Sequence, residues 1–133
     1  MKGLCQLVSK NAVVWLRGVD DETLKKLYVS SRFVVMASHA EGYGLPIAEG
    51  MAAGVPVIAG NNTAMPEVLG SCGLLVNTND VDDIMCAYKN LIEDHELCLR
   101  LGQAGAIRAR GLSWDKSAIR YSEILDELQS TTQ

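Results

Sequence analysis

The fold of this chain is decided by residues 32–60, which read RFVVMASHAEGYGLPIAEGMAAGVPVIAG. The valine-rich start of this stretch predicts a buried parallel strand over 32–37, and the short side chains of PIAEGMAA favour a helix over 45–53. Gly54 ends that helix, and the apolar residues after it predict a second buried strand over 55–59. The stretch is therefore a strand, loop, helix and strand unit, in which ligands bind where a strand leads into a helix.

The segments on either side extend the same alternation. We expect helices over 2–9, 21–30, 81–93, 95–110 and 114–129, a helical turn over 66–69, and further strands over 12–16 and 73–76. This order predicts an α/β fold with a Rossmann-like parallel sheet of about four strands wrapped by helices, in a single domain over 1–133. The last helix should dock on a surface because it carries an apolar stripe, made of Ile119, Ile124, Leu125 and Leu128.

The loop over 41–49, EGYGLPIAE, carries the polar groups expected of a site. Its two glycines let the backbone turn tightly and approach a ligand, and Pro46 suits the first helical position, where free N–H groups can hold an anion. Glu49 lies one turn further along the same helix face, where its carboxylate can bind hydroxyl groups. A carboxylate beside a phosphate site suggests a sugar ligand, although the spacing of Glu41 and Glu49 alone is more typical of a solvated loop and helix cap.

With this motif the chain resembles the retaining GT-B glycosyltransferases of the family 4 type, also called glycosyl transferases group 1. The hallmark of that family is an E-x7-E motif, which this chain carries as Glu41 and Glu49. The preceding VVWLRGVDDETLKKLYVSSRFVVMASHA resembles the strand, helix and strand that lead into the motif. The following MAAGVPVIAGNNTAMPEVLGSCGLLVNTND and the later SWDKSAIRYSEIL resemble the family's next strands and its terminal helix, so the resemblance covers about 12–128.

The resemblance implies a partial nucleotide-sugar (donor) binding domain, closed by the helices over 81–129, of an enzyme that moves a hexose from a nucleotide diphosphate sugar to a glycan or lipid-linked acceptor. It implies that Glu49 accepts hydrogen bonds from the ribose hydroxyls and that Glu41 is the catalytic residue beside the sugar. The remaining donor-binding residues that it implies are Gly42, Tyr43, Gly44, Leu45, Thr63 and Glu67. For Glu67, a carboxylate that only favours the first turn of a short helix is an equally good interpretation. The NNTAMPEV loop is most similar to mannosyltransferases, which points to GDP-mannose.

Two parts of the family pattern have no counterpart in this sequence. The acceptor-binding half is missing, and so are two strands whose Arg and Lys hold the donor diphosphate, so the chain resembles an N-terminally truncated donor-binding region. We therefore expect it to need an acceptor-binding domain or partner chain, and to form a homo-oligomer through apolar surface near Trp15 and Leu27. Tyr43 replaces the more usual Phe of the family, and His39 is expected to be a packing or loop residue.

Composition bears on partners and location. The chain has 133 residues, 48% of them hydrophobic, which is enough for a modest core, and its net charge of -4 argues against nucleic acid as a partner. We find no apolar run of membrane-spanning length, no signal peptide and no C-x-x-C pair, which together predict a cytoplasmic protein with reduced thiols. We expect no metal or other cofactor, because backbone amides can neutralise the diphosphate.

A second class of function stays open. The chain can instead be a non-catalytic remnant or subunit that binds a partner, or binds a nucleotide weakly, without transferring sugar. A Rossmann-type dehydrogenase is disfavoured because no G-x-G-x-x-G follows the first expected strand.

Overall fold

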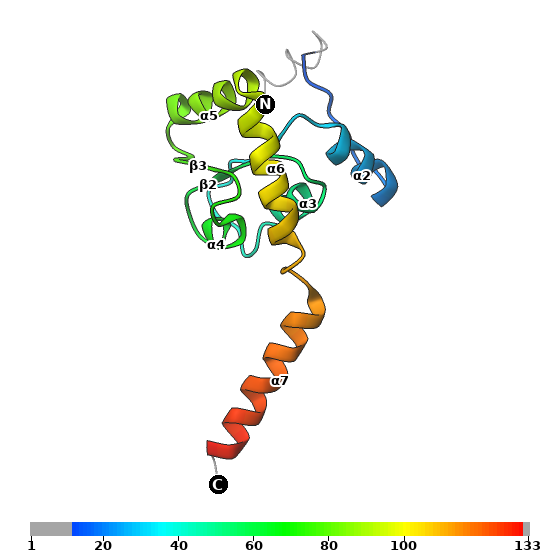
Figure 1. Ribbon diagram of the computed structural model, residues 1–133, viewed down its shortest axis with the longest axis vertical. Coiled ribbons are helices and arrows are strands. Elements are labelled where there is room, and N and C mark those ends of the chain that lie inside the picture. Colours follow the sequence, from blue (N-terminus) through cyan, green and yellow to red (C-terminus); the bar gives the residue numbers. More distant parts are fainter. Residues whose placement is uncertain (1–11, 132–133) are drawn as a thin grey trace.

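The computed structural model describes residues 12–131, and its centre is a three-stranded parallel sheet (Figure 1). The strands are β1 (Val34–Met36), β2 (Val57–Gly60) and β3 (Leu74–Val76), in the order β1-β2-β3. Val35 pairs with Ile58, which in turn pairs with Leu74. Every residue of the central strand is buried, because β2 has a neighbour on each side and helices on both faces.

Helices α3 and α4 cover one face of the sheet and α5 and α6 cover the other. The helices are α2 (Asp21–Ser30), α3 (Leu45–Ala52), α4 (Met65–Leu69), α5 (Val81–Glu93), α6 (His95–Ala109) and α7 (Trp114–Thr131). Val57 and Ala59 pack in one cluster with buried side chains of α3 and α4. Ile58 packs in a second cluster with those of α5 and α6, so the alternation of side chains along β2 divides the core into two.

Glycines let α3 and α6 come close to their neighbours. A Cβ added to Gly50 would lie 3.1 Å from Val34 Cγ2 and 3.0 Å from Val57 Cγ2, so α3 rests directly on β1 and β2. A Cβ added to Gly102 of α6 would lie 2.3 Å from the carbonyl oxygen of Gly54. Helix α3, whose first turn belongs to the candidate site, is thus closely packed against the sheet, and α6 is closely packed against the turn that follows α3.

Two arginines bind the last carbonyl groups of helices that are distant in sequence. Arg32 Nε donates to the carbonyl of Leu91 at the end of α5, with a distance of 3.2 Å. Arg108 Nε donates to the carbonyl of Val68 at the end of α4, with a distance of 2.7 Å. The final carbonyls of a helix lack partners within it, so each guanidinium completes a helix end and joins it to another element.

Most expected elements are confirmed, with bounds that differ by a few residues at most, but two expectations are wrong. The described residues of 12–16 form no strand, so the sheet has three strands instead of about four. A strand needs a neighbour to satisfy its backbone groups, and β1 pairs only with β2 among the described residues. Apolar side chains of this segment stay exposed, Trp15 to 51%. The helix expected over 2–9 lies outside the described residues.

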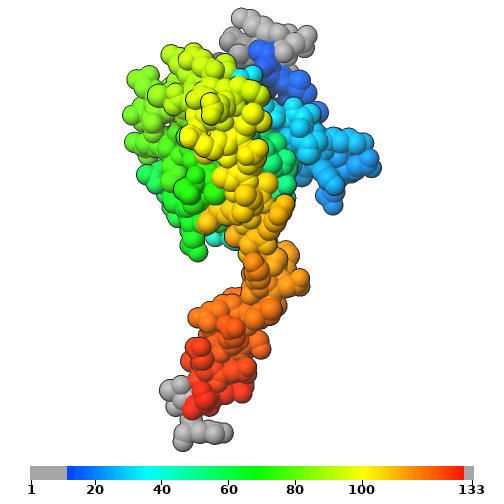
Figure 2. Space-filling view, viewed as in Figure 1, coloured from blue at the N-terminus to red at the C-terminus, as the bar shows by residue number. Residues whose placement is uncertain are grey.

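The prediction that the last helix docks is also wrong for the part of the chain that is described. Helix α7 extends away from the sheet and its covering helices (Figure 1), and the space-filling view shows it as a separate arm (Figure 2). Ser113 begins the helix, because its Oγ accepts from the N–H of Lys116 at 3.3 Å. Its apolar stripe is exposed, Leu125 to 56%. The helix was correctly predicted, but the apolar side chains of its stripe are exposed and do not belong to the core.

Candidate functional site

Three polar loops follow the three strands and therefore lie at one edge of the sheet. They comprise residues 37–44 after β1, 61–64 after β2 and 77–80 after β3. The strands are parallel, so all three loops begin at strand carboxyl ends, where open α/β sheets bind ligands. None of the three loops contains a lysine or arginine. The charged side chains of these loops are the carboxylates of Glu41 and Asp80, and the backbone N–H groups at the start of α3 supply positive potential beside them.

Side-chain hydrogen bonds connect these loops to one another. The backbone N–H of Glu41 donates to Thr63 Oγ1 at 3.0 Å, which joins the first loop to the second. Asn62 Nδ2 donates to Thr78 Oγ1 at 3.2 Å, and the same oxygen lies 3.3 Å from Nδ1 of His39, which joins all three. The buried Oδ1 of Asn62 has no hydrogen-bond partner among residues 12–131.

Thr63 has an unusual backbone conformation that supports this arrangement. Its φ is 49°, and it is the one non-glycine residue with positive φ among those described. This left-handed conformation is unfavourable for a β-branched residue. The conformation directs Oγ1 to the N–H of Glu41, whose side chain is half-buried. The structure thus brings together two residues that the sequence analysis had placed in the site.

The first loop enters α3 through Gly44. Gly44 is the N-cap with a φ of 91°, and no side chain caps this helix. A Cβ at Gly44 would lie 3.0 Å from Ile47 Cδ1, so both conformation and space require glycine. The helix begins at Leu45, which makes Pro46 the second helical residue and not the first as expected. Tyr43 and Gly42 are exposed in the loop, beside a helix start that can bind an anion.

Glu49 lies one helical turn beyond the loop, on the exposed face that also includes Leu45 and Ala52. Its Oε2 accepts a hydrogen bond from the hydroxyl of Tyr28, in α2, at 2.8 Å. Burial, reinforced by the bond to Glu49, raises the pKa of Tyr28 well above its ordinary value. Glu49 and Tyr28 both line a groove of about 440 Å³ between α2 and α3.

The structure places Glu67 apart from the loop network. It lies in the first turn of α4, where an exposed carboxylate is favoured by the helix dipole. Its backbone carbonyl accepts from Arg108 Nη2, and no hydrogen bond of its carboxylate is found within the described part of the chain. His39 is exposed and bonds to the loop after β3, as a loop residue would.

Sequence analysis missed the residues that support the site. Asn62 and Thr78 could have been found, because each lies in a polar run directly after an expected strand. Tyr28 carried no such signal, since its spacing in α2 indicated only an apolar helix face. Its bond to Glu49 joins positions that are 21 residues apart.

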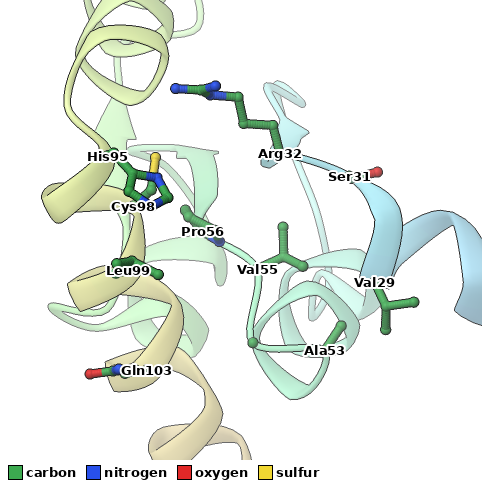
Figure 3. A pocket seen from close by; sticks show the side chains of 11 residues that line it. Val29, Ser31, Arg32, Ala53, Val55, Pro56, His95, Cys98, Leu99 and Gln103 are labelled. Atoms are coloured by element: carbon green, nitrogen blue, oxygen red, sulfur yellow. The ribbon is translucent and has the colours of Figure 1, made fainter.

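A second cavity, of about 290 Å³, opens at the opposite edge of the sheet (Figure 3). It lies between the segment that leads into β2, including Val55 and Pro56, and the first two thirds of α6, including His95 and Gln103. None of the predicted site residues lines it. The guanidinium of Arg32 is directed to the end of α5, where it binds backbone carbonyls.

The described residues contain no cluster of three or more His, Cys, Asp or Glu side chains that could hold a metal ion. Cys72, Cys86 and Cys98 are free thiols. Between residues 12 and 131, no helix is both long and apolar enough to cross a membrane.

The comparisons with known proteins agree on one family. The model of that family, described as glycosyl transferases group 1, matches residues 5–108. The chain is 38% identical over 116 residues to the O-antigen chain mannosyltransferase B of Escherichia coli, which covers 84% of this chain and 30% of that protein. It is 36% identical over 114 residues to the MMP alpha-(1->4)-mannosyltransferase of Mycolicibacterium hassiacum, covering 83% of this chain and 28% of that protein.

Solved structures agree with the sequence relatives. A sucrose-phosphate synthase of Thermosynechococcus elongatus superposes with a TM-score of 0.83 at 27% identity, over 98% of this chain and 34% of that one. The C-terminal domain of a glycosyl transferase group 1 family protein of Francisella tularensis gives 0.68 at 29% identity, over 83% of this chain and 60% of that one. The chain spans about a third or less of the two mannosyltransferases. By sequence and by fold, this chain belongs to the glycosyl transferases group 1 family.

Proposed function

We propose that this chain is the donor-binding region of a retaining GT-B glycosyltransferase that transfers a hexose from a nucleotide diphosphate sugar to a glycan or lipid-linked acceptor. The observation that carries the proposal is the placement of the E-x7-E motif of this family at the ligand-binding edge of the sheet. Glu41 lies in a loop fixed by Thr63, and Glu49 lies one turn into the helix that follows. Carboxylates at this edge suit the hydroxyl groups of a nucleotide sugar.

In this proposal the two glutamates bind different parts of the donor. The uncapped start of α3 and the backbone of Gly42 to Leu45 bind the diphosphate, and Glu49 accepts hydrogen bonds from the ribose. Glu41 lies beside the transferred sugar, with Tyr43, Thr63 and Glu67 completing the donor pocket. The acceptor hydroxyl attacks the anomeric carbon on the face from which the diphosphate departs, and its proton passes to the leaving phosphate oxygen. Configuration is retained without a protein nucleophile.

Mannose is the sugar that we propose for the donor, carried by GDP. The support is that two relatives sharing more than a third of their aligned residues with this chain are mannosyltransferases. The chain also carries the NNTAMPEV loop next to the site. Calorimetric titration with a panel of nucleotide sugars tests this choice, and preference for a UDP-sugar over GDP-mannose would contradict it.

Substitution of Glu41 and of Glu49, one at a time, in an intact enzyme that contains this segment tests the roles proposed for the two glutamates. Glu49→Ala should raise the KM for the donor about tenfold or more with little change in kcat, because it removes a bond to a part of the donor that does not react. Glu41→Ala should mainly lower kcat, because contacts to the reacting sugar strengthen in the transition state. Glu93→Ala, at the exposed end of α5, is the matched control. Equal kinetic effects of the two site changes would refute the division of roles.

Separately, the 133-residue chain should bind nucleotide sugars weakly and transfer none. Its three site loops offer no cation to the diphosphate, and each missing charge-assisted bond weakens binding by about 1.5 to 3 kcal/mol. Efficient turnover by the purified chain would contradict this expectation.

A module that binds a partner without transferring sugar is the second candidate function. The observation in its favour is the exposed apolar stripe of α7, which extends away from the sheet (Figure 1). Loss of nucleotide binding from the intact enzyme on Glu49→Ala would favour the donor-binding function over this one.

A further inference from the structure

We propose that Tyr28 is a positioning residue, which holds the carboxylate of Glu49 in the orientation that receives the ribose of the donor. This inference rests on the proposed donor-binding function. It assigns a role in the site to α2, a helix that lies outside the E-x7-E motif and the three loops at the edge of the sheet.

The geometry of the pair supports this role. The Tyr28 hydroxyl donates to Glu49 Oε2 at 2.8 Å, the ordinary length of a hydrogen bond from a hydroxyl to an oxygen acceptor. Tyr28 is partly buried, whereas Glu49 is exposed on α3. A tyrosine side chain turns about only two torsions, so the bond restricts an exposed carboxylate that has more freedom of its own.

Glu49 needs such support because nothing else fixes it. The structure gives its carboxylate no hydrogen bond other than that to Tyr28, within residues 12–131. A glutamate with several free torsions loses rotamer entropy when a ligand orders it, and prior ordering by Tyr28 removes part of that loss.

The bond also leaves the carboxylate able to bind a diol. An ionised carboxylate has two oxygens with about four acceptor positions, and the tyrosine hydroxyl occupies one position on Oε2. Oε1 and the second position on Oε2 remain for the neighbouring 2′- and 3′-hydroxyls of a ribose. The tyrosine therefore assists the bond to ribose without competing for it.

A nucleotide pair that differs only at the ribose tests the role. The chain is titrated with GDP and with 2′,3′-dideoxy-GDP, and likewise with UDP and its dideoxy form, using amide chemical shifts to follow weak binding. Tyr28→Phe should weaken binding of the ribonucleotide about fivefold, the usual effect of one lost bond, and leave the dideoxynucleotide unchanged. Tyr121→Phe, on α7, removes the same hydroxyl from an exposed ring and should change neither.

The outcomes separate the possible failures. Equal weakening of both nucleotides by Tyr28→Phe would mean that the tyrosine only ties α2 to α3, and would overturn the proposal. The proposal would also be overturned if Glu49→Ala weakened binding of the ribonucleotide and Tyr28→Phe did not. A further loss on adding Tyr28→Phe to Glu49→Ala would also overturn it, because a residue that acts through Glu49 has no effect once Glu49 is gone. If Glu49→Ala changes no affinity, or no nucleotide binds, the donor-binding function itself fails and the role of Tyr28 fails with it.

A measurement without nucleotide checks the bond itself. With tyrosine labelled at the ring carbon that bears the hydroxyl, the pKa of Tyr28 should lie above the ordinary value of a tyrosine. Glu49→Gln, which keeps the side-chain shape, should lower the pKa of Tyr28 but not return it fully to its ordinary value, since burial remains. An unchanged titration of Tyr28 in Glu49→Gln would show that the pair is not bonded in solution and would overturn the proposal.

Discussion

The backbone of Thr63 allows a test that separates strain from function. Two variants, Thr63→Val and Thr63→Gly, remove the hydroxyl that accepts from the N–H of Glu41. Thr63→Val keeps a β-branched side chain at a φ of 49°, whereas Thr63→Gly places at this φ a residue that adopts it without strain. Both lose a hydrogen bond that contributes about 0.5 to 1.5 kcal/mol to the free energy of unfolding. Only the glycine variant also relieves the left-handed conformation, which costs a residue with a side chain about 1 to 2 kcal/mol.

We therefore expect the free energy of unfolding to be higher for Thr63→Gly than for Thr63→Val. Thr63→Val should be less stable than the natural chain by about 1 kcal/mol, because it loses the bond and keeps the strain. In Thr63→Gly the loss and the relief should nearly cancel, so this variant should be about 1 to 2 kcal/mol more stable than Thr63→Val. Urea denaturation followed by circular dichroism measures the difference, and the melting temperatures should differ by about 4 to 8 °C.

Nucleotide affinity should behave differently from stability. Both variants release the loop of Glu41 from Thr63, so both should weaken binding of GDP-mannose to a similar degree. Thr63→Ser keeps the hydroxyl and should retain both stability and affinity, which makes it the control. If Thr63→Gly proves less stable than Thr63→Val, or if it alone retains affinity, the strained residue is not held in place by its bond to Glu41.

Three further outcomes are expected. Gly102→Ala should destabilise the chain by about 1 to 3 kcal/mol in urea denaturation, because its Cβ would lie 2.3 Å from the carbonyl oxygen of Gly54; a gain in stability would mean that α6 is not closely packed there. The chain should form a homo-oligomer through apolar surface near Trp15, so light scattering should show association that Trp15→Ser weakens, and a clean monomer at high concentration would contradict this. The pKa of Asp20 is lowered by its hydrogen bond to Thr23, so its capping of α2 is complete above the ordinary pKa of aspartate and is lost as pH falls through the lowered value; Asp20→Ala should remove this acid-induced loss of helix signal, and an unchanged pH profile would argue against the cap.

Much of the fold and part of the site could be predicted from sequence, for physical reasons that particular residues make clear. The strand around Val35 and the helix around Ile47 are specified by their own hydrophobic pattern and by the glycines beside them. The expectation for 12–16 failed because apolar residues such as Trp15 favour a strand only where a neighbouring strand is available. The pattern of α7 likewise specified a helix and its apolar face, but not a surface for that face.

In the site, too, local sequence patterns predicted some residues and not others. The motif identified Glu41 and Glu49, and the rule that ligands bind where a strand leads into a helix placed the site in the loop after β1. The hydroxyl of Thr63 bonds the backbone N–H of Glu41 across 22 residues of sequence, and the hydroxyl of Tyr28 bonds the carboxylate of Glu49 across 21. Such partners depend on tertiary packing, which local patterns do not encode. Thr63 was placed in the site by family resemblance, and Tyr28 was missed.

The two arginines that bind helix ends have a consequence for how this small domain opens. Arg32 precedes β1 and binds the end of α5, and Arg108 lies in α6 and binds the end of α4. Each of these helices must release a guanidinium from distant sequence before its last turn can fray, so neither end opens without disturbing the core. The segment from β1 to α6 should consequently exchange its amide hydrogens as one cooperative unit, while α7 opens independently at lower free energy.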